Sequence, residues 1–183
     1  MAVRETYRRL LRELARDNYG YVTTQMAAGA GVPAVELRKL AARGGLENVA
    51  YGLYQFDDMA GDEHAQLMEA VLTAGPEAHL VGETVLAMHG LGLVNPAKVH
   101  VGTPRRVRAT LPAHIDLVHD NLPAEDLTSY EGIPSTTVAR ALIDCAPTMM
   151  RDRLLAAVEQ ANQQGLLRRR DVVRVRTAVS GAR

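Results

Sequence analysis

NYGYVTTQMAAGAGVPAVELRKLAARGGLENVAYGLYQF, residues 18–56, is the stretch of sequence that decides the fold. Thr23 or Thr24 is a suitable N-cap, because a threonine hydroxyl can accept hydrogen bonds from the free amides of a first helical turn. A short helix is therefore predicted from Gln25. Its small residues, 27–30, would let a second helix approach closely, and Gly31 would supply the sharp turn between the two.

The second helix of this pair is predicted over residues 34–43. Pro33 fits its first position, where the missing N–H costs nothing, and Gly44-Gly45 stops it. Helical spacing places one group of apolar residues toward the core: Leu37, Leu40 and Ala41. The remaining side chains would face water or a DNA groove: Ala34, Glu36, Arg38, Lys39 and Arg43. This is the candidate recognition helix.

The segments on either side of the pair complete a winged unit. Residues 46–50 and 53–56 flank Tyr51-Gly52 and predict a β-hairpin, which in this position is a wing. Upstream, residues 4–16 are expected to form the first helix of a three-helix core. The apolar positions of that helix are Val3, Tyr7, Leu10, Leu11 and Leu14, and its arginines 8, 9, 12 and 16 would lie on the outer side.

A winged helix-turn-helix predicts binding to duplex DNA. Arg38 and Lys39, together with Glu36, are expected near base edges, while the first helix and the wing would hold phosphates. The complete set of expected DNA-binding residues is Thr23, Thr24, Gln25, Ala34, Glu36, Arg38, Lys39, Arg43 and Tyr51. Two alternatives to DNA binding remain open: the basic helix face is only solvated, or the unit makes only protein contacts. For Glu36, a pair with a neighbouring lysine or arginine is the alternative to a base contact.

The charges are unevenly distributed, although the 183-residue chain has no net charge. Residues 1–57 carry a net charge of +2, residues 58–150 of −7 and residues 151–183 of +5. Phosphate would repel the acidic middle, so DNA would touch the ends. Alternatively, the middle and the tail pair with each other or meet a partner protein. Possible secondary DNA contacts, which are equally compatible with a solvated surface, are Arg105, Arg106, Arg168, Arg169 and Arg170.

The domain boundary is expected near residue 58, because residues 57–61 are small and acidic and would form a hinge. Residues 1–57 would be the winged domain and residues 58–183 a mixed α/β domain, giving an α+β, mainly helical fold. Helices are predicted over residues 63–72, 83–89, 138–145 and 151–163. A last helix is predicted to start within residues 168–171. Strands are predicted over residues 98–101 and 114–119, with residues 103–112 as a basic hairpin loop between them.

Enzymatic function is not expected. The six histidines lack zinc-site spacing, and no phosphate-cradling or serine-hydrolase motif is present, so no metal or cofactor is predicted. The least implausible catalytic alternative is a carboxylate nuclease that uses Glu83, Asp116 or Glu131. Cys145, the single cysteine, is expected to be a buried structural thiol. No apolar run of about 18 residues exists, which predicts a cytoplasmic protein without a membrane segment.

The whole pattern resembles the AbiEi family of antitoxins. Residues 20–56 resemble its N-terminal winged-helix domain, and HLVGETVLAMHGLGL (79–93), KVHVGTP (98–104) and EGIPSTTVARALIDCA (131–146) resemble parts of its companion domain. The resemblance implies the antitoxin of a bacterial type IV toxin–antitoxin pair, whose toxin is nucleotidyltransferase-like. It further implies repression of the protein's own operon at repeated promoter sequences, with possible self-association on DNA, and a C-terminal domain that serves antitoxicity.

Two features depart from the family pattern. At the wing tip, Tyr51 stands where the family often has an arginine, so a phenol hydroxyl would replace a guanidinium at that contact. The chain also ends at Arg183, before the endonuclease-like domain of some relatives. A second class of function stays open beside the repressor: a protein-interaction module that neutralises its partner directly through the C-terminal domain, with little specific DNA binding. Whether the toxin is contacted directly is equally open.

Overall fold

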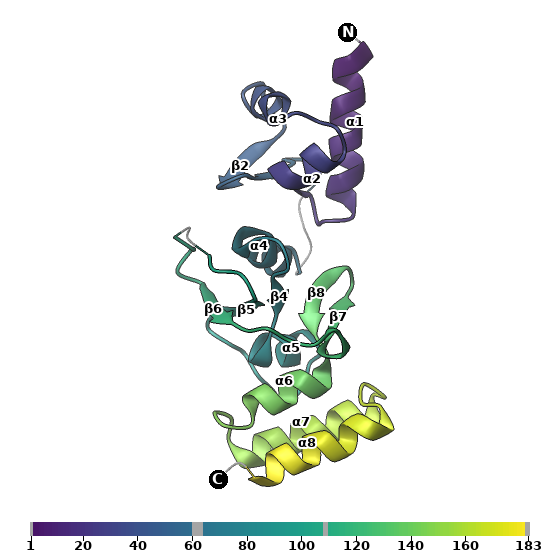
Figure 1. Ribbon diagram of the computed structural model, residues 1–183, viewed down its shortest axis with the longest axis vertical. Helices are drawn as coiled ribbons and strands as arrows, with labels where there is room; N and C mark the ends of the chain where they lie inside the picture. Colours follow the sequence, from purple (N-terminus) through teal and green to yellow (C-terminus); the bar gives the residue numbers. More distant parts are fainter. Residues whose placement is uncertain (1, 60–63, 108–109, 182–183) are drawn as a thin grey trace. The chain divides into compact units, whose positions relative to one another are not determined.

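The computed structural model describes residues 2–59, 64–107 and 110–181, without the side chains of residues 2–6. The chain divides into two compact units, Met1–Gly75 and Pro76–Arg183. Each is described here by itself (Figure 1). Residues 60 and 61 of the predicted hinge lie outside the described residues, and the boundary near residue 58 stays a prediction.

The first unit begins with helix α1, Ala2–Arg16. As its apolar spacing predicts, Leu11 and Ala15 are fully buried, and Tyr7, Leu10 and Leu14 pack against the same cluster. Val3 of the predicted stripe lies outside the described side chains. Arg12 differs from the expected outer position, because its guanidinium lies 5.3 Å from the centre of the Phe56 ring and is paired with Asp58. This ion pair lowers the pKa of Asp58.

The helix-turn-helix and the wing follow in the predicted order. Their bounds are β1 Tyr21–Thr23, α2 Thr24–Gly29, α3 Ala34–Ala41, β2 Glu47–Ala50 and β3 Leu53–Gln55. The strands form an antiparallel sheet in the order β1-β3-β2, so β1 joins the wing hairpin to the helices. Strand β1 was not predicted, because a strand of three residues is too short to show apolar alternation in sequence. The helices and the sheet enclose one core, in which Leu11, Val22, Ala27 and Leu37 have no exposed surface.

Several local expectations about the two helices need adjustment. The small residues of α2 do not all serve close packing: Ala27 is buried, but Ala28 and Gly29 are exposed, and a Cβ on Gly29 would meet nothing within 4 Å. Pro33 is the N-cap of α3 and not its first helical residue, and the helix ends at Ala41 instead of Arg43. The glycine stops are as predicted, since Gly31, Gly44 and Gly45 have φ values of 76°, 82° and 85°.

Helix α4, Ala65–Ala74, closes the first unit and ends before Gly75. It is connected to the small sheet by a hydrogen bond of 2.8 Å, which the Tyr21 hydroxyl donates to Glu69 Oε2. Burial of the phenol and the adjacent Glu69 carboxylate raise the pKa of Tyr21. The predicted helix over residues 63–72 is thus shifted toward the C-terminus, and residue 63 lies outside the described residues.

The second unit is built on a mixed five-stranded sheet, which supports the expected α/β character of this part of the chain. Its strand order is β6-β5-β4-β8-β7. The bounds are β4 His79–Leu80, β5 Val99–Thr103, β6 Ile115–His119, β7 Leu127–Tyr130 and β8 Ile133–Thr136. Strands β4, β7 and β8 were not predicted. They are short or carry polar and proline residues, and therefore lack the apolar alternation that marks a strand in sequence.

The predicted hairpin between the two sequence-derived strands is wrong. Strands β5 and β6 pair in parallel, with Val99 opposite Ile115 and Thr103 opposite His119. The chain must therefore run back from one end of β5 to the other before β6 begins, so residues 104–114 are a crossover connection. Residues 108 and 109 within it are not described. Apolar alternation identifies a strand but carries no information about the direction of its neighbour, which explains the error.

Helices accompany this sheet at positions close to those predicted. Their bounds are α5 Gly82–Met88, α6 Val138–Cys145, α7 Arg151–Gln163 and α8 Arg169–Gly181, with a 3-10 turn, η1, at Ala124–Asp126. Helix α6 packs against α5 on one side and against α7 and α8 on the other. Thr137 caps α6 by accepting from the amide of Arg140. Within the described residues, no helix is both long and apolar enough to cross a bilayer.

Candidate nucleic-acid interface

Helix α3 presents the expected face away from the core of its unit. Leu37 is completely buried on the inner side, and Leu40 and Ala41 pack beside it. On the other side, Ala34, Arg38 and Lys39 are exposed. An eight-residue helix held by one apolar edge thus leaves its opposite edge open along its full length.

The charges on this face are not equivalent. Lys39 Nζ lies 2.8 Å from Glu36 Oε1, and the Glu36 side chain is only 19 % exposed. The alternative that Glu36 pairs with a neighbouring lysine is therefore the one observed. The side chain of Arg38, by contrast, has no hydrogen bond or ion pair to any described residue. It is the cation of α3 with a guanidinium available for a ligand.

The threonines before α2 are used by the fold itself. Thr23 Oγ1 accepts from the amide of Met26 at 3.0 Å, which confirms the predicted N-cap, and the Met26 sulfur in turn lies 3.5 Å from the amide of Thr23. The amide of Thr24 donates to the carbonyl oxygen of Gly52 at 2.8 Å. Gln25, the next residue, is exposed. Of these three expected phosphate contacts, Gln25 is the one least engaged in hydrogen bonds within the protein.

The wing is a tight turn with an aromatic tip. Asn48 Nδ2 donates to the carbonyl oxygens of Ala50 and Leu53, at 3.0 and 3.2 Å, and so closes the turn from inside. Gly52 adopts φ 69°, a left-handed conformation. The Tyr51 side chain projects from this turn and is 100 % exposed. An exposed phenol held on a closed turn can donate to a phosphate oxygen or enter a groove.

Arg43 lies beyond the end of α3 and contributes to a hollow in the surface. It lines, with Arg8, a cavity of about 360 Å³ whose apolar wall contains Leu40, Leu46 and Phe56. The side chain is exposed. Arg43 therefore belongs to the surface beyond the C-terminal end of α3.

The first pair of secondary candidates differs in availability. Arg105 makes a two-point contact with Glu77, at 2.7 Å from Nε to Oε2 and 3.0 Å from Nη2 to Oε1. This contact lowers the pKa of Glu77 and raises that of Arg105. Arg106 is exposed. A DNA contact by Arg105 would have to break an existing ion pair, whereas one by Arg106 would not.

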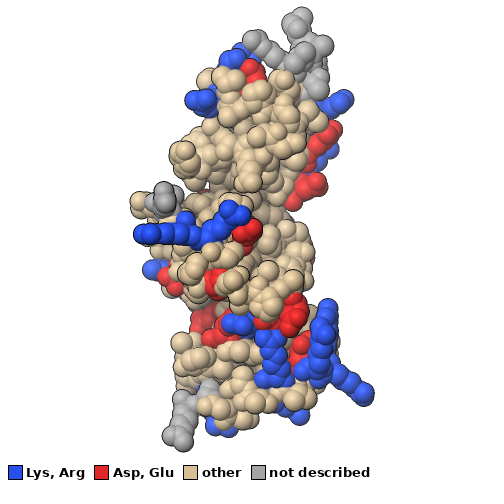
Figure 2. Space-filling view, in the orientation of Figure 1, with Lys and Arg blue, Asp and Glu red and all other residues tan. Residues whose placement is uncertain are grey.

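The arginines at the start of α8 are exposed: Arg168, Arg169 and Arg170. Figure 2 shows Lys and Arg side chains gathered around the junction of α7 and α8. Two of them, Arg168 and Arg170, share a cavity of about 210 Å³ with Glu125 and Asp171, and Arg170 Nε lies 3.8 Å from Asp171 Oδ1. The positive charge at this junction is thus partly balanced by local carboxylates.

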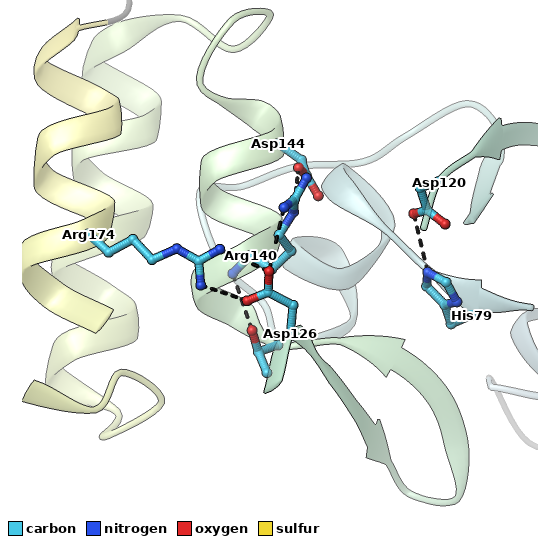
Figure 3. A network of polar contacts seen from close by, with 7 residues as sticks. His79, Asp120, Asp126, Arg140, Asp144 and Arg174 are labelled. Atoms are coloured by element: carbon cyan, nitrogen blue, oxygen red, sulfur yellow. Dashed lines mark hydrogen bonds and ion pairs between the residues drawn. The ribbon is translucent and has the colours of Figure 1, made fainter. Parts of the chain in front are cut away.

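Arg174, further along α8, has a structural role. Its guanidinium contacts both oxygens of Asp126, at 2.6 and 2.9 Å, and the Asp126 side chain is only 2 % exposed (Figure 3). Arg140 adds a longer contact of 3.5 Å to Asp126 and a shorter one of 2.8 Å to Asp144. The hydrogen bond from Arg174 is the main cause that lowers the pKa of Asp126. The alternative in which the acidic middle pairs with the basic tail is observed at this contact.

The carboxylates considered for catalysis meet only in part. Glu83 and Asp116 line one cavity of about 380 Å³, together with Asp120 and Asp144, but Glu131 is not among the lining residues. Among the described residues, no group of three or more His, Cys, Asp or Glu side chains is arranged to hold a metal ion. Asp120 is also engaged, since His79 Nε2 lies 3.2 Å from its Oδ2 (Figure 3).

Cys145 lines the same cavity and is 2 % exposed, as expected for a structural thiol. Burial, reinforced by the carboxylates of Glu83 and Asp144, raises the pKa of Cys145 to about 12. A thiol with such a pKa is almost entirely protonated at neutral pH, and the thiolate is the nucleophilic form. The residue is therefore poorly suited to covalent catalysis.

The first unit as a whole has the architecture of a winged helix-turn-helix: three helices, a turn at Gly31, and a two-stranded wing after the second helix of the pair. Residues 9–56 match the family model described as transcriptional regulator, AbiEi antitoxin. The resemblance drawn from the sequence is thereby confirmed over this segment, which is similar to the winged domain of a family of transcriptional regulators.

Two further comparisons accompany this match. The crystal structure of the RV2827C protein from Mycobacterium tuberculosis is similar to this chain with a TM-score of 0.49 and 20 % sequence identity, over 97 % of this chain and 72 % of that chain. A search of curated proteins finds no match.

One residue of the outer face of α3 was missed by the sequence analysis. Val35 is 45 % exposed, although it is apolar and lies between charged neighbours. The signal was present in the sequence, because helical spacing from Leu37, Leu40 and Ala41 already directs position 35 outward.

Proposed function

We propose that the winged unit binds duplex DNA with α3 in the major groove, and that the protein thereby represses transcription from its own promoter. The observation that carries this proposal is Arg38. It stands on the open face of the second helix of a helix-turn-helix, and its side chain has no partner among the described residues. In this architecture that helix is the one that enters the groove.

The remaining contacts follow from what each side chain already does. Arg38 would donate to guanine O6 and N7, the most frequent specific contact of arginine in DNA complexes. Lys39 would move to a phosphate, since an i,i+3 pair on one helix, such as the one with Glu36, contributes only about 0.2–0.5 kcal/mol. Gln25 and Tyr51, both exposed, would bind phosphates on either side and fix the register of the unit.

The test is a fluorescence titration of the full chain against the DNA immediately upstream of its own gene. A scrambled duplex of equal length and composition serves as the control, and each titration is made at two salt concentrations. We expect selective binding that weakens steeply with salt, because each neutralised phosphate releases about one counterion. Equal affinity for both duplexes would refute specific operator binding.

A matched pair of variants locates the interface. Arg38→Ala combined with Lys39→Ala should reduce promoter affinity at least tenfold while the fold, measured by circular dichroism, stays unchanged. Arg9→Ala is the control, since Arg9 is 73 % exposed on the side of α1 opposite the core residues and pairs only loosely with Glu13. Unchanged promoter affinity of the double variant would remove α3 from the interface.

We propose further that this repressor is the antitoxin of a type IV toxin–antitoxin pair with a nucleotidyltransferase-like toxin, and that several copies occupy repeated promoter sequences. The family match over residues 9–56 supports the antitoxin role. Co-expression with the neighbouring gene tests it: growth arrest by that gene alone, relieved by this protein, is the expected result. If the double α3 variant relieves arrest as well as the wild type, neutralisation does not depend on the DNA interface. Rescue together with a stable complex of the two proteins would favour the protein-interaction alternative.

A further inference from the structure

Val35 occupies the centre of the outward face of α3. At about 100° per residue, the mean direction of the inward residues Leu37, Leu40 and Ala41 lies about 170° from that of Val35. Leu37 has no exposed surface, whereas Val35 is 45 % exposed. The residue that points most directly away from the core of the first unit is thus an aliphatic one.

This position is not explained by the stability of the helix. A β-branched residue has a lower helix propensity than alanine or a long polar residue, and a solvated face gives no packing in return. Single exposed apolar residues are common and mean little alone. The place of Val35 is informative because Arg38 and Lys39 lie on either side of it on the same face.

The groove offers one chemical partner for such a side chain. In the major groove, thymine alone among the four bases presents a methyl group, and apolar side chains contact it there. A valine has no donor or acceptor and would leave a cytosine amine or a guanine oxygen without a partner. Position 35 also lies in the first turn of α3, and the N-terminal residues of a recognition helix are those that reach base edges.

We propose that Val35 contacts the 5-methyl group of a thymine, next to the base pair that Arg38 reads. This inference rests on the proposed binding of α3 in the major groove. Three residues of helix advance about 4.5 Å, and neighbouring base pairs are about 3.4 Å apart, so Val35 and Arg38 meet adjacent positions. The operator therefore contains a guanine beside a thymine, and the specificity of α3 is part apolar and part ionic.

Replacement of thymine by uracil tests the contact on the DNA side, because it removes the methyl group and leaves base pairing and every hydrogen-bonding group intact. Single replacements are made at each thymine of the bound promoter region, and the affinity of the full chain is measured for each duplex. We expect one thymine in each binding site at which uracil weakens binding about fourfold, equivalent to the ~0.8 kcal/mol of one buried methyl group.

Val35→Ala tests the same contact on the protein side. Alanine has the higher helix propensity, so the variant is expected to fold. It should bind the unmodified promoter several-fold more weakly and should not discriminate between thymine and uracil at the sensitive position. Val173→Ala is the matched control, since Val173 is 68 % exposed on α8 and loses the same two methyl groups. The control variant should keep wild-type affinity and wild-type sensitivity to uracil.

The outcomes separate this inference from the proposed function. Selective promoter binding in which no thymine responds to uracil would overturn the role of Val35 and leave the repressor intact. The same holds if Val35→Ala retains the sensitivity, since another residue would then contact the methyl group. An absence of sequence-selective binding by the wild type would overturn both.

Discussion

Arg174 and Asp126, 48 residues apart in sequence, form the shortest ion pair among the described residues, at 2.6 Å from Nη1 to Oδ1. A second contact of 2.9 Å makes the pair two-point, and the carboxylate is almost completely buried. The last helix is therefore attached to the sheet side of the second unit by charge as well as by its apolar residues Val175 and Val179. The basic tail is part of the fold of this unit.

Loss of this pair should destabilise the second unit. Asp126→Asn keeps the shape of the side chain but leaves two arginines without their buried anion. We expect a decrease of about 2 to 3 kcal/mol in the free energy of unfolding, at the lower end for a buried pair because Arg174 is 42 % exposed. Urea unfolding measures it. A change below half a kilocalorie per mole would mean that the pair contributes no net stability.

The same pair predicts a pH dependence with a defined sign. Arg174 holds the pKa of Asp126 below its usual range, which is about 3.9 in an unfolded chain. The stabilisation is therefore complete above about pH 5 and is lost as the pH falls through that unfolded value toward the lower folded one. Thermal unfolding of the wild type and Asp126→Asn between about pH 6 and pH 2.5 should give curves that converge at low pH. Other carboxylates with lowered pKa, such as Asp58 and Glu77, are present in both proteins and cancel in the difference. Parallel curves would contradict the assignment to Asp126.

Gly102 on β5 should tolerate no side chain. A Cβ there would lie 2.5 Å from Asp120 Oδ2, 2.7 Å from Val81 Cγ1 and 2.8 Å from His79 Nε2. Gly102→Ala would separate the His79–Asp120 contact or move the strand, at a cost of about 1 to 3 kcal/mol. Gly181→Ala in α8, where a Cβ meets nothing within 4 Å, is the control and should change stability by less than about 0.5 kcal/mol. Equal stability of the two variants would show that the sheet accommodates the methyl group.

The arginines at the start of α8 should contribute little to DNA binding, because Glu125 and Asp171 line the cavity that Arg168 and Arg170 share. Removal of the whole tail would not test this, since α8 is part of the core of its unit. Triple substitution of residues 168–170 by alanine keeps the helix, and we expect unchanged promoter affinity and an unchanged slope of affinity against salt. A slope smaller by about 1 or more would assign at least one of these arginines to a phosphate.

The sequence predicted most of the first unit because its signals are local. Thr23 is a cap, Gly31 and Gly44 are stops, and the spacing of Leu37 and Leu40 defines a face, all within a few residues of one another. Strand direction in the second unit was not predictable in this way. The parallel pairing of β5 with β6 depends on contacts between distant segments.

In the candidate site, too, features set by local sequence were predictable and features set by contacts between distant residues were not. Exposure of Arg38 and of Tyr51 followed from helix and turn geometry. The commitment of Arg105 to Glu77 and of Arg174 to Asp126 did not, because each pairing joins residues far apart in the chain. A row of arginines in a sequence gives their total charge but not the share that internal carboxylates neutralise.

The hydrogen bond from the Thr24 amide to the Gly52 carbonyl oxygen has a consequence for association with a ligand. It joins the first residue of α2 to the turn that carries Tyr51, and the Thr24 side chain lies so near the turn that a Cβ on Gly52 would be 3.0 Å from Thr24 Oγ1. The conformational entropy of the wing is thus lost when the protein folds and need not be lost again at the encounter. The fold therefore sets the distance from the tip of the wing to the helix pair before any ligand binds. A DNA surface whose groove width does not match this distance fits poorly, whatever contacts the individual side chains could make.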